Sequence, residues 1–470
     1  MSPGKRRRAA EVQRRQRTRR LDLVTGLAVL LPLLTVGFLA LVQQPPERDT
    51  TQPPSLTRLT GVTLVCPAAQ PGSPDAVVST ASGASGDLTV ISDGRSGSVQ
   101  VSTGATTPLP DTGSVVVKGA DELAPGLLGL RSGTAPLSAQ GCSVPTSDQW
   151  FTGIGARADH DSVIELVNPD AGSANVDVTL FGTQPISNRR LRGLTVPGHK
   201  TLTLDLGQLI PRRPLLSAHV QVTRGRLGVH VLDQQTDLAR HRTQREWMPA
   251  QSVPTTSLTM LGLPTGTGTR TLQLANPGED VVRAQLKVVT GDTSFVPKGV
   301  DTVSIPPGST TEVSLTQELG KALGDGALGV SVEADGPVTA SLLTSLEADR
   351  VLTVPDDEVA HEAATLLPVA SGKGATPVRG QVLLTADAAG SATVTAYDAS
   401  GKKLLDKRVG LQQGHTATLT LPEGASFLRV VPQGTPVRGS VLVTGDGASV
   451  LPLHELLTQG LVPQISPGLS

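Results

Sequence analysis

Short runs of alternating apolar and polar residues dominate the chain from residue 59 onward. Residues 201–206 read Thr-Leu-Thr-Leu-Asp-Leu, and residues 175–180 and 285–288 follow the same two-residue period. Successive side chains of a β-strand point to opposite faces, so this period predicts strands with one buried and one solvated face. Asn-Pro and Pro-Gly turns separate the runs. The pattern predicts a mainly β protein made of short strands.

Two turns recur along the chain. The Asn-Pro turn at Asn168 returns at Asn276, 108 positions later, and Gly198 of a Pro-Gly turn returns at Gly308, 110 positions later. Diverged copies precede and follow these two. Six or seven short strands per copy fit an immunoglobulin-like sandwich, whereas propeller blades repeat at about 40 to 50 residues. We predict four tandem immunoglobulin-like β-sandwiches at 59–145, 146–250, 251–360 and 361–460, the third with a short helical crossover beginning at residues 317–321.

An uncharged run of twenty residues extends from Leu23 to Val42, and residues 1–20 carry nine basic side chains and one acid. About 20 apolar residues span a bilayer, and a basic flank stays in the cytoplasm. A cleaved signal peptide is the competing interpretation, but its apolar stretch is usually shorter. We predict a single-pass cell-membrane protein with a cytoplasmic N-terminus. Its predicted parts are a basic tail at 1–20, a signal-anchor helix at 21–43, a Pro-rich stalk at 44–58, and an extracytoplasmic remainder that ends in a tail at 461–470.

Charge and aromatic content narrow the predicted partners. Without residues 1–20 the chain has 31 basic and 40 acidic residues, so the predicted ectodomain lacks an overall basic surface for nucleic acid. Aromatic residues make up 2% of the chain, which is few for a protein that grips sugars by ring stacking. The predicted partners are the membrane and an envelope protein or wall polymer.

The two cysteines, Cys66 and Cys142, both fall in the first predicted sandwich, on the oxidising side of the membrane. A metal site needs more ligands nearby, and a catalytic thiol needs a histidine that this sandwich lacks. We therefore predict a structural disulfide. On the chain-entropy model a loop of this length stabilises the fold by about 4 kcal/mol.

Asp159, His160 and Asp161, with Glu165 nearby, form the densest cluster of side chains that could bind a divalent cation or move protons. A solvated loop is the competing interpretation, because the corresponding residues 269–271 of the next copy are not acidic. The sequence contains no H-E-x-x-H, G-x-S-x-G, Walker or C-x-x-C motif. The three residues are weak acid-base candidates, and no catalytic residue, metal site or cofactor is predicted.

Two further groups are candidates for partner binding. Trp150 and Trp247 border the second predicted sandwich, where they either pack one module against the next or expose rings to a glycan. Arginines concentrate in the same sandwich and, on a shared face, would pair with an anionic wall polymer or an acidic partner. A dispersed solvated surface is the competing interpretation. The arginines in this set are Arg189, Arg190, Arg192, Arg212 and Arg213.

The order of turns resembles bacterial immunoglobulin-like modules of cell-surface proteins, in which an Asn-Pro turn is followed by a Pro-Gly turn. The whole layout, with its basic tail, anchor, Cys66-Pro67 pair and tandem β-modules, is similar to an uncharacterised family of actinobacterial envelope proteins. The fourth copy departs from the pattern with Ala386-Asp387 in place of Asn-Pro. Turns and strands carry this resemblance, and they imply an architecture without implying chemistry.

Architecture alone favours a non-catalytic binding or scaffolding protein on the extracytoplasmic side of the envelope. One alternative is an enzyme or enzyme-accessory subunit of cell-wall glycan metabolism, with Asp159, His160 and Asp161 as its reactive groups. The other is a transmembrane sensor that signals through the basic tail.

Overall fold

The chain forms two compact units, one made of Met1–Thr57 with Leu461–Ser470 and the other of Arg58–Gly460. The computed structural model describes residues 27–28, 30–38, 55–73, 75–109, 112–134, 136–186, 189–300, 302–347, 349–370 and 375–462.

In the first unit, residues 27–28 and 30–38 are helical, and their leucine side chains are exposed. No helix within the described residues has both the length and the apolar character needed to span a membrane. The predicted tail at 1–20, the rest of the predicted anchor at 21–43 and residues 44–54 of the predicted stalk lie outside the described residues, as do residues 463–470. The last four stalk residues form β1 (Ser55–Arg58), which pairs with β35 (Gln459–Val462).

The second unit is built from strands, which form four modules within the described residues. Modules 1 and 4 each have two separate sheets, whereas the strands of module 2 and those of module 3 each join into one eight-stranded sheet. Module 1 contains β2 (Gly61–Cys66), β3 (Asp75–Thr80), β4 (Gly86–Ser92), β5 (Arg95–Val101), β6 (Thr107–Leu109), β7 (Val115–Ala120), β8 (Leu127–Thr134) and β9 (Leu137–Gly141). Module 2 contains β10 (Asp148–Arg157), β11 (His160–Val167), β12 (Ala174–Gly182), β13 (Leu194–Val196), β14 (Thr201–Asp205), β15 (Arg213–Arg224), β16 (Gly228–Asp237) and β17 (Arg242–Met248).

Module 3 contains β18 (Thr255–Leu261), β19 (Gly268–Asn276), β20 (Val282–Thr290), β21 (Ser294–Phe295), β22 (Val303–Ile305), β23 (Ser309–Ser314), β24 (Ala327–Leu346) and β25 (Arg350–Thr353). Module 4 contains β26 (Glu358–Val359), β27 (Ala363–Leu366), β28 (Arg379–Thr385), β29 (Gly390–Asp398), β30 (Lys403–Leu411), β31 (Thr416–Thr420), β32 (Ala425–Gln433), β33 (Val437–Gly445) and β34 (Gly447–Pro452). The short helices are η1 (Asp121–Leu123), η2 (Arg189–Leu191), α2 (Leu206–Leu209), α3 (Thr316–Ala322) and η3 (Leu323–Asp325).

One strand order repeats in all four modules. In module 1 the sheets run β2-β7-β4-β5 and β6-β3-β8-β9. The same order gives β10-β15-β12-β13 with β14-β11-β16-β17 in module 2, and β27-β32-β29-β30 with β31-β28-β33-β34 in module 4. In module 3 the single long strand β24 supplies both the sixth and the seventh strand. The modules therefore share eight strand positions, more than the six or seven predicted, and β21 in module 3 and β26 in module 4 are additional short strands.

A buried asparagine ties together the two turns of the repeat. The Asn168 side chain donates to Val196 O at 2.9 Å and to Gly172 O at 2.8 Å, and it accepts from Asp170 N at 3.0 Å. Asn276 does the same in module 3, donating to Ile305 O at 3.1 Å and accepting from Gly278 N at 2.9 Å. The Asn-Pro turn and the Pro-Gly turn are thus one structural unit joined by a side-chain amide.

The predicted disulfide is present, joining Cys66 at the end of β2 to Cys142 just after β9. It links the two sheets of module 1 beside the core cluster that contains Cys66, Val115 and Val117. The predicted crossover helix is also present as α3.

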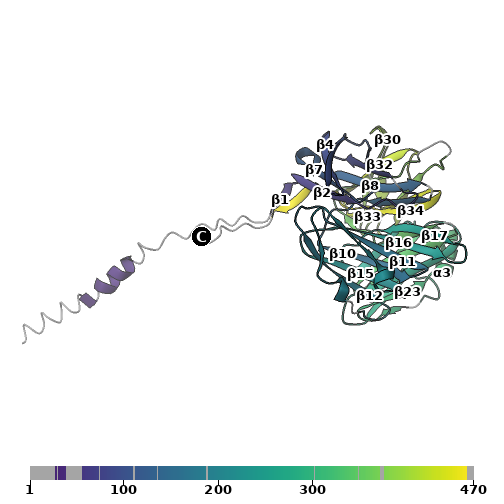
Figure 1. The fold of residues 1–470 in the computed structure, drawn as a ribbon, viewed down its shortest axis with the longest axis horizontal. Helices are drawn as coiled ribbons and strands as arrows, with labels where there is room; N and C mark the ends of the chain where they lie inside the picture. The colour runs from purple at the N-terminus through teal and green to yellow at the C-terminus, as the bar shows by residue number, and fades with distance from the viewer. Residues whose placement is uncertain are drawn as a thin grey trace, which may run out of the picture. The chain divides into compact units, whose positions relative to one another are not determined.

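The four modules form a closed ring, in which module 1 contacts module 4 as well as module 2. Strands of modules 1 and 4 lie side by side in Figure 1, as do those of modules 2 and 3. Leu130, Leu137 and Ala139 of module 1 belong to the same apolar cluster as the core of module 4. A second apolar cluster, which includes Leu261 and Leu442, joins module 3 to module 4.

The last strand of each module meets its neighbours at the centre of the ring, where β9 contacts β17, β17 contacts β25, β25 contacts β34 and β34 contacts β9. One polar cluster, here called the hub, draws a group from every module. The Ser449 hydroxyl lies 3.4 Å from both Ala139 O and Glu246 Oε1, and Asp349 accepts from Ala448 N at 2.6 Å. Glu246 and Asp349 are 2% and 7% exposed, so two carboxyl groups are buried in the hub.

Burial, followed by repulsion from Asp349, raises the pKa of Glu246 well above its usual value. Burial raises the pKa of Asp349 to about 6, and Asp446 adds to the effect. An acid whose pKa is higher in the folded state than in the unfolded state favours folding when protonated, so its contribution is lost as pH rises through the folded-state pKa.

We predict that the melting temperature falls between pH 5 and pH 8, and that Glu246→Gln reduces this fall because the amide stays neutral. Calorimetry of both proteins across this range measures it, with the exposed Glu423→Gln as the matched control. If the melting temperature of Glu246→Gln fell with pH as steeply as that of the wild type, the Glu246 carboxyl would not be the group responsible.

We also predict that Asn168→Ala lowers the free energy of unfolding by about 2 kcal/mol, because it leaves buried carbonyl groups without a donor. Asn175→Ala is the control, since Asn175 lies on β12 outside the turn and should cost much less. Urea unfolding monitored by tryptophan fluorescence compares the two variants, and similar losses would contradict the role assigned to Asn168.

Candidate functional site

The predicted acid-base cluster does not converge on one point. Asp159, Asp161 and His160 occupy the hairpin between β10 and β11, but each has different partners. Asp159 forms an ion pair with Arg157, with one hydrogen bond of 2.6 Å from Nη2, and this bond lowers the pKa of Asp159. Asp161 accepts from Gly207 N at 2.8 Å, and burial followed by repulsion from Asp205 raises its pKa.

His160 instead contributes to a buried joint between modules 2 and 3. Its Nδ1 lies 3.0 Å from Pro214 O, and its Nε2 lies 3.0 Å from Asp233 Oδ1 and 3.2 Å from Arg350 Nη2. Arg350 also forms an ion pair with Asp233, and both side chains are almost fully buried, 1% and 0% exposed. Because both ring nitrogens already have protein partners, His160 is placed to hold the joint and does not face a substrate.

Burial by itself would raise the pKa of Asp233, but the charges of Arg350 and His160 outweigh it and the pKa lies below its usual value. The Ser162 hydroxyl hydrogen-bonds to the same carboxylate. A nucleophilic serine would need its hydroxyl on the imidazole and an open face toward substrate. The arrangement is therefore that of a charged structural contact.

Both tryptophans are buried. Trp150 is 5% exposed and stacks on His219 with ring centroids 4.0 Å apart, and Trp247 is 3% exposed. Neither presents an open ring, which favours the packing interpretation of Trp150 and Trp247 over the glycan-contact alternative. Their role is packing.

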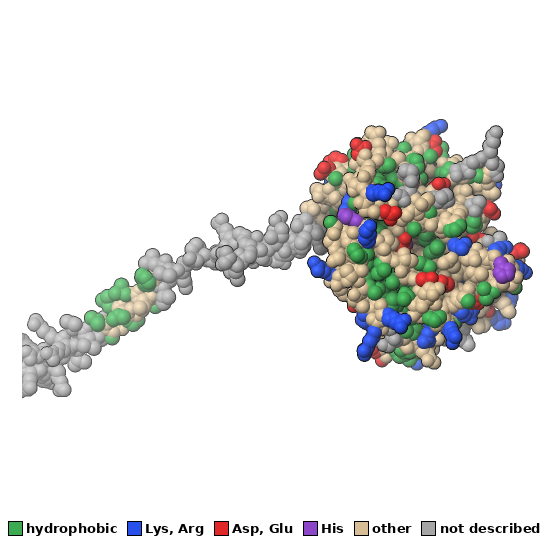
Figure 2. Space-filling model, viewed as in Figure 1, with side chains coloured by type: hydrophobic (Ala, Val, Ile, Leu, Met, Phe, Trp, Pro, Cys, Tyr) green, Lys and Arg blue, Asp and Glu red, His purple; other side chains and the backbone are tan. Residues whose placement is uncertain are grey.

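The predicted arginine set lies in two surface segments. The first segment contains Arg189 and Arg190 of η2 and then Arg192, whose Nη1 lies 4.0 Å from Asp177 Oδ2. The second contains Arg212 and Arg213 at the start of β15. All five side chains are exposed. On the face drawn in Figure 2, Lys and Arg side chains are spread among acidic and apolar ones, which fits a dispersed surface.

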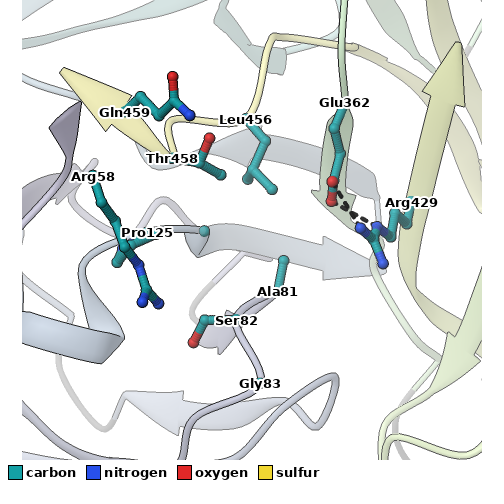
Figure 3. Close-up of a pocket in the computed structure, with 11 residues that line it drawn as sticks. Arg58, Ala81, Ser82, Gly83, Pro125, Glu362, Arg429, Leu456, Thr458 and Gln459 are labelled. Atoms are coloured by element: carbon teal, nitrogen blue, oxygen red, sulfur yellow. Dashed lines mark hydrogen bonds and ion pairs between the residues drawn. The ribbon is translucent and has the colours of Figure 1, made fainter. Parts of the chain in front are cut away.

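A groove of about 380 Å³ lies at the seam between modules 1 and 4 (Figure 3). On the module 4 side, the Glu455 carboxylate accepts hydrogen bonds from three consecutive backbone N–H groups, those of Ala360 at 2.7 Å, His361 at 3.1 Å and Glu362 at 3.3 Å. This clamp fixes Glu362, which accepts two parallel hydrogen bonds from Arg429 at 2.6 and 2.7 Å. Two parallel hydrogen bonds hold both side chains in a defined orientation.

On the module 1 side, Arg58 pairs with Glu122 through contacts of 3.2 and 2.7 Å, and both side chains are exposed. Ser82 and Gly83 also line the groove, and Figure 3 draws Ser82 with the Arg58 side chain. Ala81, Pro125 and Leu456 provide an apolar lining, with Pro125 and Leu456 buried.

Residues 456–459, here called the closing segment, bridge the seam. Leu456 N donates to Glu362 O at 2.7 Å on module 4, whereas Leu457 O accepts from Gly126 N at 3.1 Å and Thr458 O accepts from Leu59 N at 3.2 Å. Thr458 and Gln459 also line the groove. The groove therefore exists only where the first and last modules are held together.

Comparisons with known proteins identify a family but no activity. A family described as a family of unknown function, DUF5719, matches residues 131–422. A crystal structure of Streptomyces avermitilis α-L-rhamnosidase complexed with L-rhamnose is 9% identical, and the match covers 82% of this chain and 57% of that chain. Its TM-score of 0.12 is too low to carry an argument about fold or function. No curated protein matches the chain.

We predict that Arg350→Met lowers the free energy of unfolding by about 3 to 5 kcal/mol, because it leaves the Asp233 charge buried without its partner. Asp159→Ala removes only an exposed ion pair and should cost less than about 1 kcal/mol. Chemical denaturation of both variants measures the difference. A large loss for Asp159→Ala, or none for Arg350→Met, would contradict this division of roles.

Proposed function

This chain belongs to DUF5719, a family of unknown function, and we propose that it is a non-catalytic binding or scaffolding protein of the cell envelope. One membrane span holds it, with the basic tail in the cytoplasm and the four modules on the extracytoplasmic side. The groove between modules 1 and 4 is the surface that receives a partner, either an envelope protein or a wall polymer.

The anchoring half of this proposal rests on the N-terminal pattern. Residues 27–28 and 30–38 are helical and expose leucine side chains, which is costly in water and favourable in lipid. The uncharged run to which they belong follows nine basic residues, the arrangement of an uncleaved anchor. The disulfide fits an oxidising compartment outside the cytoplasm.

The binding half rests on one observation: the groove walls come from both ends of the folded unit and are fixed by hydrogen bonds before any partner arrives. Glu455 holds the loop that carries Glu362, and the closing segment bonds to both modules. A recognition surface mounted on rigid elements loses little conformational entropy when it binds. Four modules closed into a ring supply that rigidity.

We regard the modules as immunoglobulin-like in their central strands. The second strand pairs with the fifth and the third with the sixth in every module, as in β3–β6 and β4–β7 of module 1. These pairs match the B–E and C–F pairs of immunoglobulin sheets. Two outer strands depart from that fold, because the first strand pairs with the sixth and the seventh strand pairs with the second, as in β2–β7 and β3–β8 of module 1. Sandwiches of this kind commonly present loops and edges to partners.

We predict that a photo-crosslinking amino acid at Gln459, in the groove, captures an envelope protein or a wall polymer in living cells. The control places the same amino acid at Gln317 on α3, which is exposed and belongs to module 3. Mass spectrometry and glycan analysis identify the captured material. The proposal fails if the two positions capture the same background, or if the modules are not exposed on the outer side of the membrane.

A further inference from the structure

We propose that the groove between modules 1 and 4 binds an uncharged saccharide, held by hydrogen bonds without ring stacking. This inference rests on the proposed binding role and names the chemistry of its ligand. Three properties of the groove carry it, namely its charge balance, the kinds of groups that line it, and the origin of its walls in two modules.

The charges in the groove are already balanced. The Arg429 guanidinium is paired with Glu362, and the Arg58 guanidinium with Glu122. A charged ligand would have to break one of these pairs or bring a charge that nothing compensates. An uncharged ligand leaves both pairs in place, which favours neutral chemistry.

The ion pairs still leave hydrogen-bonding capacity for a ligand. Within the described residues, Arg429 uses Nε and Nη2 to bind Glu362, so its Nη1 remains a donor. Arg58 uses Nη1 and Nη2 to bind Glu122, so its Nε remains a donor. Thr458 and Gln459 add a hydroxyl and an amide group that both donate and accept, whereas the Ser82 hydroxyl already hydrogen-bonds to Thr80 Oγ1 at 2.9 Å. Sugar hydroxyl groups also donate and accept, and therefore match such a lining.

The rest of the lining fits the apolar face of a sugar ring. Ala81, Pro125 and Leu456 present small aliphatic surfaces, and none of the residues that line the groove is aromatic. The only two tryptophans of the chain are buried. A saccharide in this groove is therefore gripped by polar side chains, with aliphatic carbon against its C–H face.

A ligand in the groove would contact both of the modules that meet at the seam. Ser82 and Pro125 belong to module 1, Glu362 and Arg429 to module 4, and Gln459 lies beside the closing segment's bonds to both. A ligand that binds only the closed seam stabilises the closed ring by mass action. Saccharide binding should therefore raise the melting temperature as well as give a binding signal.

The test measures binding of three neutral tetrasaccharides, cellotetraose, tetra-N-acetylchitotetraose and mannotetraose, to the full-length protein in detergent micelles. Tetragalacturonate is the anionic comparison. Calorimetry or ligand-observed NMR gives the affinity, and a thermal melt gives the change in melting temperature. We expect at least one neutral tetrasaccharide to bind more tightly than tetragalacturonate and to raise the melting temperature.

Arg429→Lys keeps the positive charge but removes the planar fork. It should weaken saccharide binding by about tenfold or more, the value of one lost charge-assisted hydrogen bond. Arg408→Lys is the matched control, because Arg408 lies on β30 of the same sheet and does not line the groove. Melting of both variants without ligand checks that each is folded.

Tighter binding of tetragalacturonate, equal binding by Arg429→Lys and the wild type, or no binding of any neutral tetrasaccharide would each overturn the saccharide inference. These results are separable from failure of the proposed function. A protein captured at Gln459 in cells, together with no saccharide binding, would retain the scaffold and reject the glycan ligand.

Discussion

The meeting of the four last strands at the hub is the constraint on which the rest of the structure depends. A chain of β-modules joined end to end would place module 1 far from module 4, and the groove would not exist. Closure instead brings β9 against β34 and merges Leu130, Leu137 and Ala139 of module 1 with the core of module 4. Apolar burial supplies the free energy of this contact, since polar groups buried in the hub pay a desolvation cost.

A contribution to stability therefore does not explain why polar side chains are buried in the hub. Glu246 lies opposite Asp233 in the β16–β17 register, and Asp349 directly precedes Arg350. The hub is thus continuous with the buried ion pair that joins modules 2 and 3. Flat apolar interfaces tolerate sliding, whereas a buried charge is satisfied in only one alignment. We infer that these side chains fix the register of the ring, as buried polar residues do in some other assemblies.

Local features of the fold were predictable from the sequence because they depend on nearby residues. Alternation gave the strands, and a helical segment was expected where α3 begins. The detailed alignment of the turns was less accurate. Gly198 was matched to Gly308, but the left-handed position is His199, with φ of 53°, and it corresponds to Gly308 at 58° and Gly414 at 75°. Histidine adopts this conformation at a modest cost, so glycine alone did not mark the position.

The contacts of the candidate site residues were less predictable, because the residues that they contact lie far away in the sequence. His160 is adjacent to Asp159 and Asp161 in sequence, but its contacts are with Asp233, 73 positions away, and Arg350, 190 positions away. No local motif encodes such a joint. The groove is similar, since Arg58 joins the Glu362–Arg429 pair of module 4 only after the ring closes. The repeated turns and strands identify the modules, but they do not determine which faces of these diverged modules meet.

The chain path links the hub directly to the groove. Ser449 contacts Glu246 in the hub, Glu455 clamps the loop that carries Glu362, and Leu456 lines the groove, all within one stretch of the chain that begins in β34. Leu453 N donates to Gly439 O at 2.9 Å, which holds this stretch against β33. A shift of β34 at the hub would displace the clamp and with it the Glu362–Arg429 wall. The shape of the groove therefore depends on closure of the ring. A ligand that bridges the seam favours the closed ring, whereas a change that loosens the hub favours the open one.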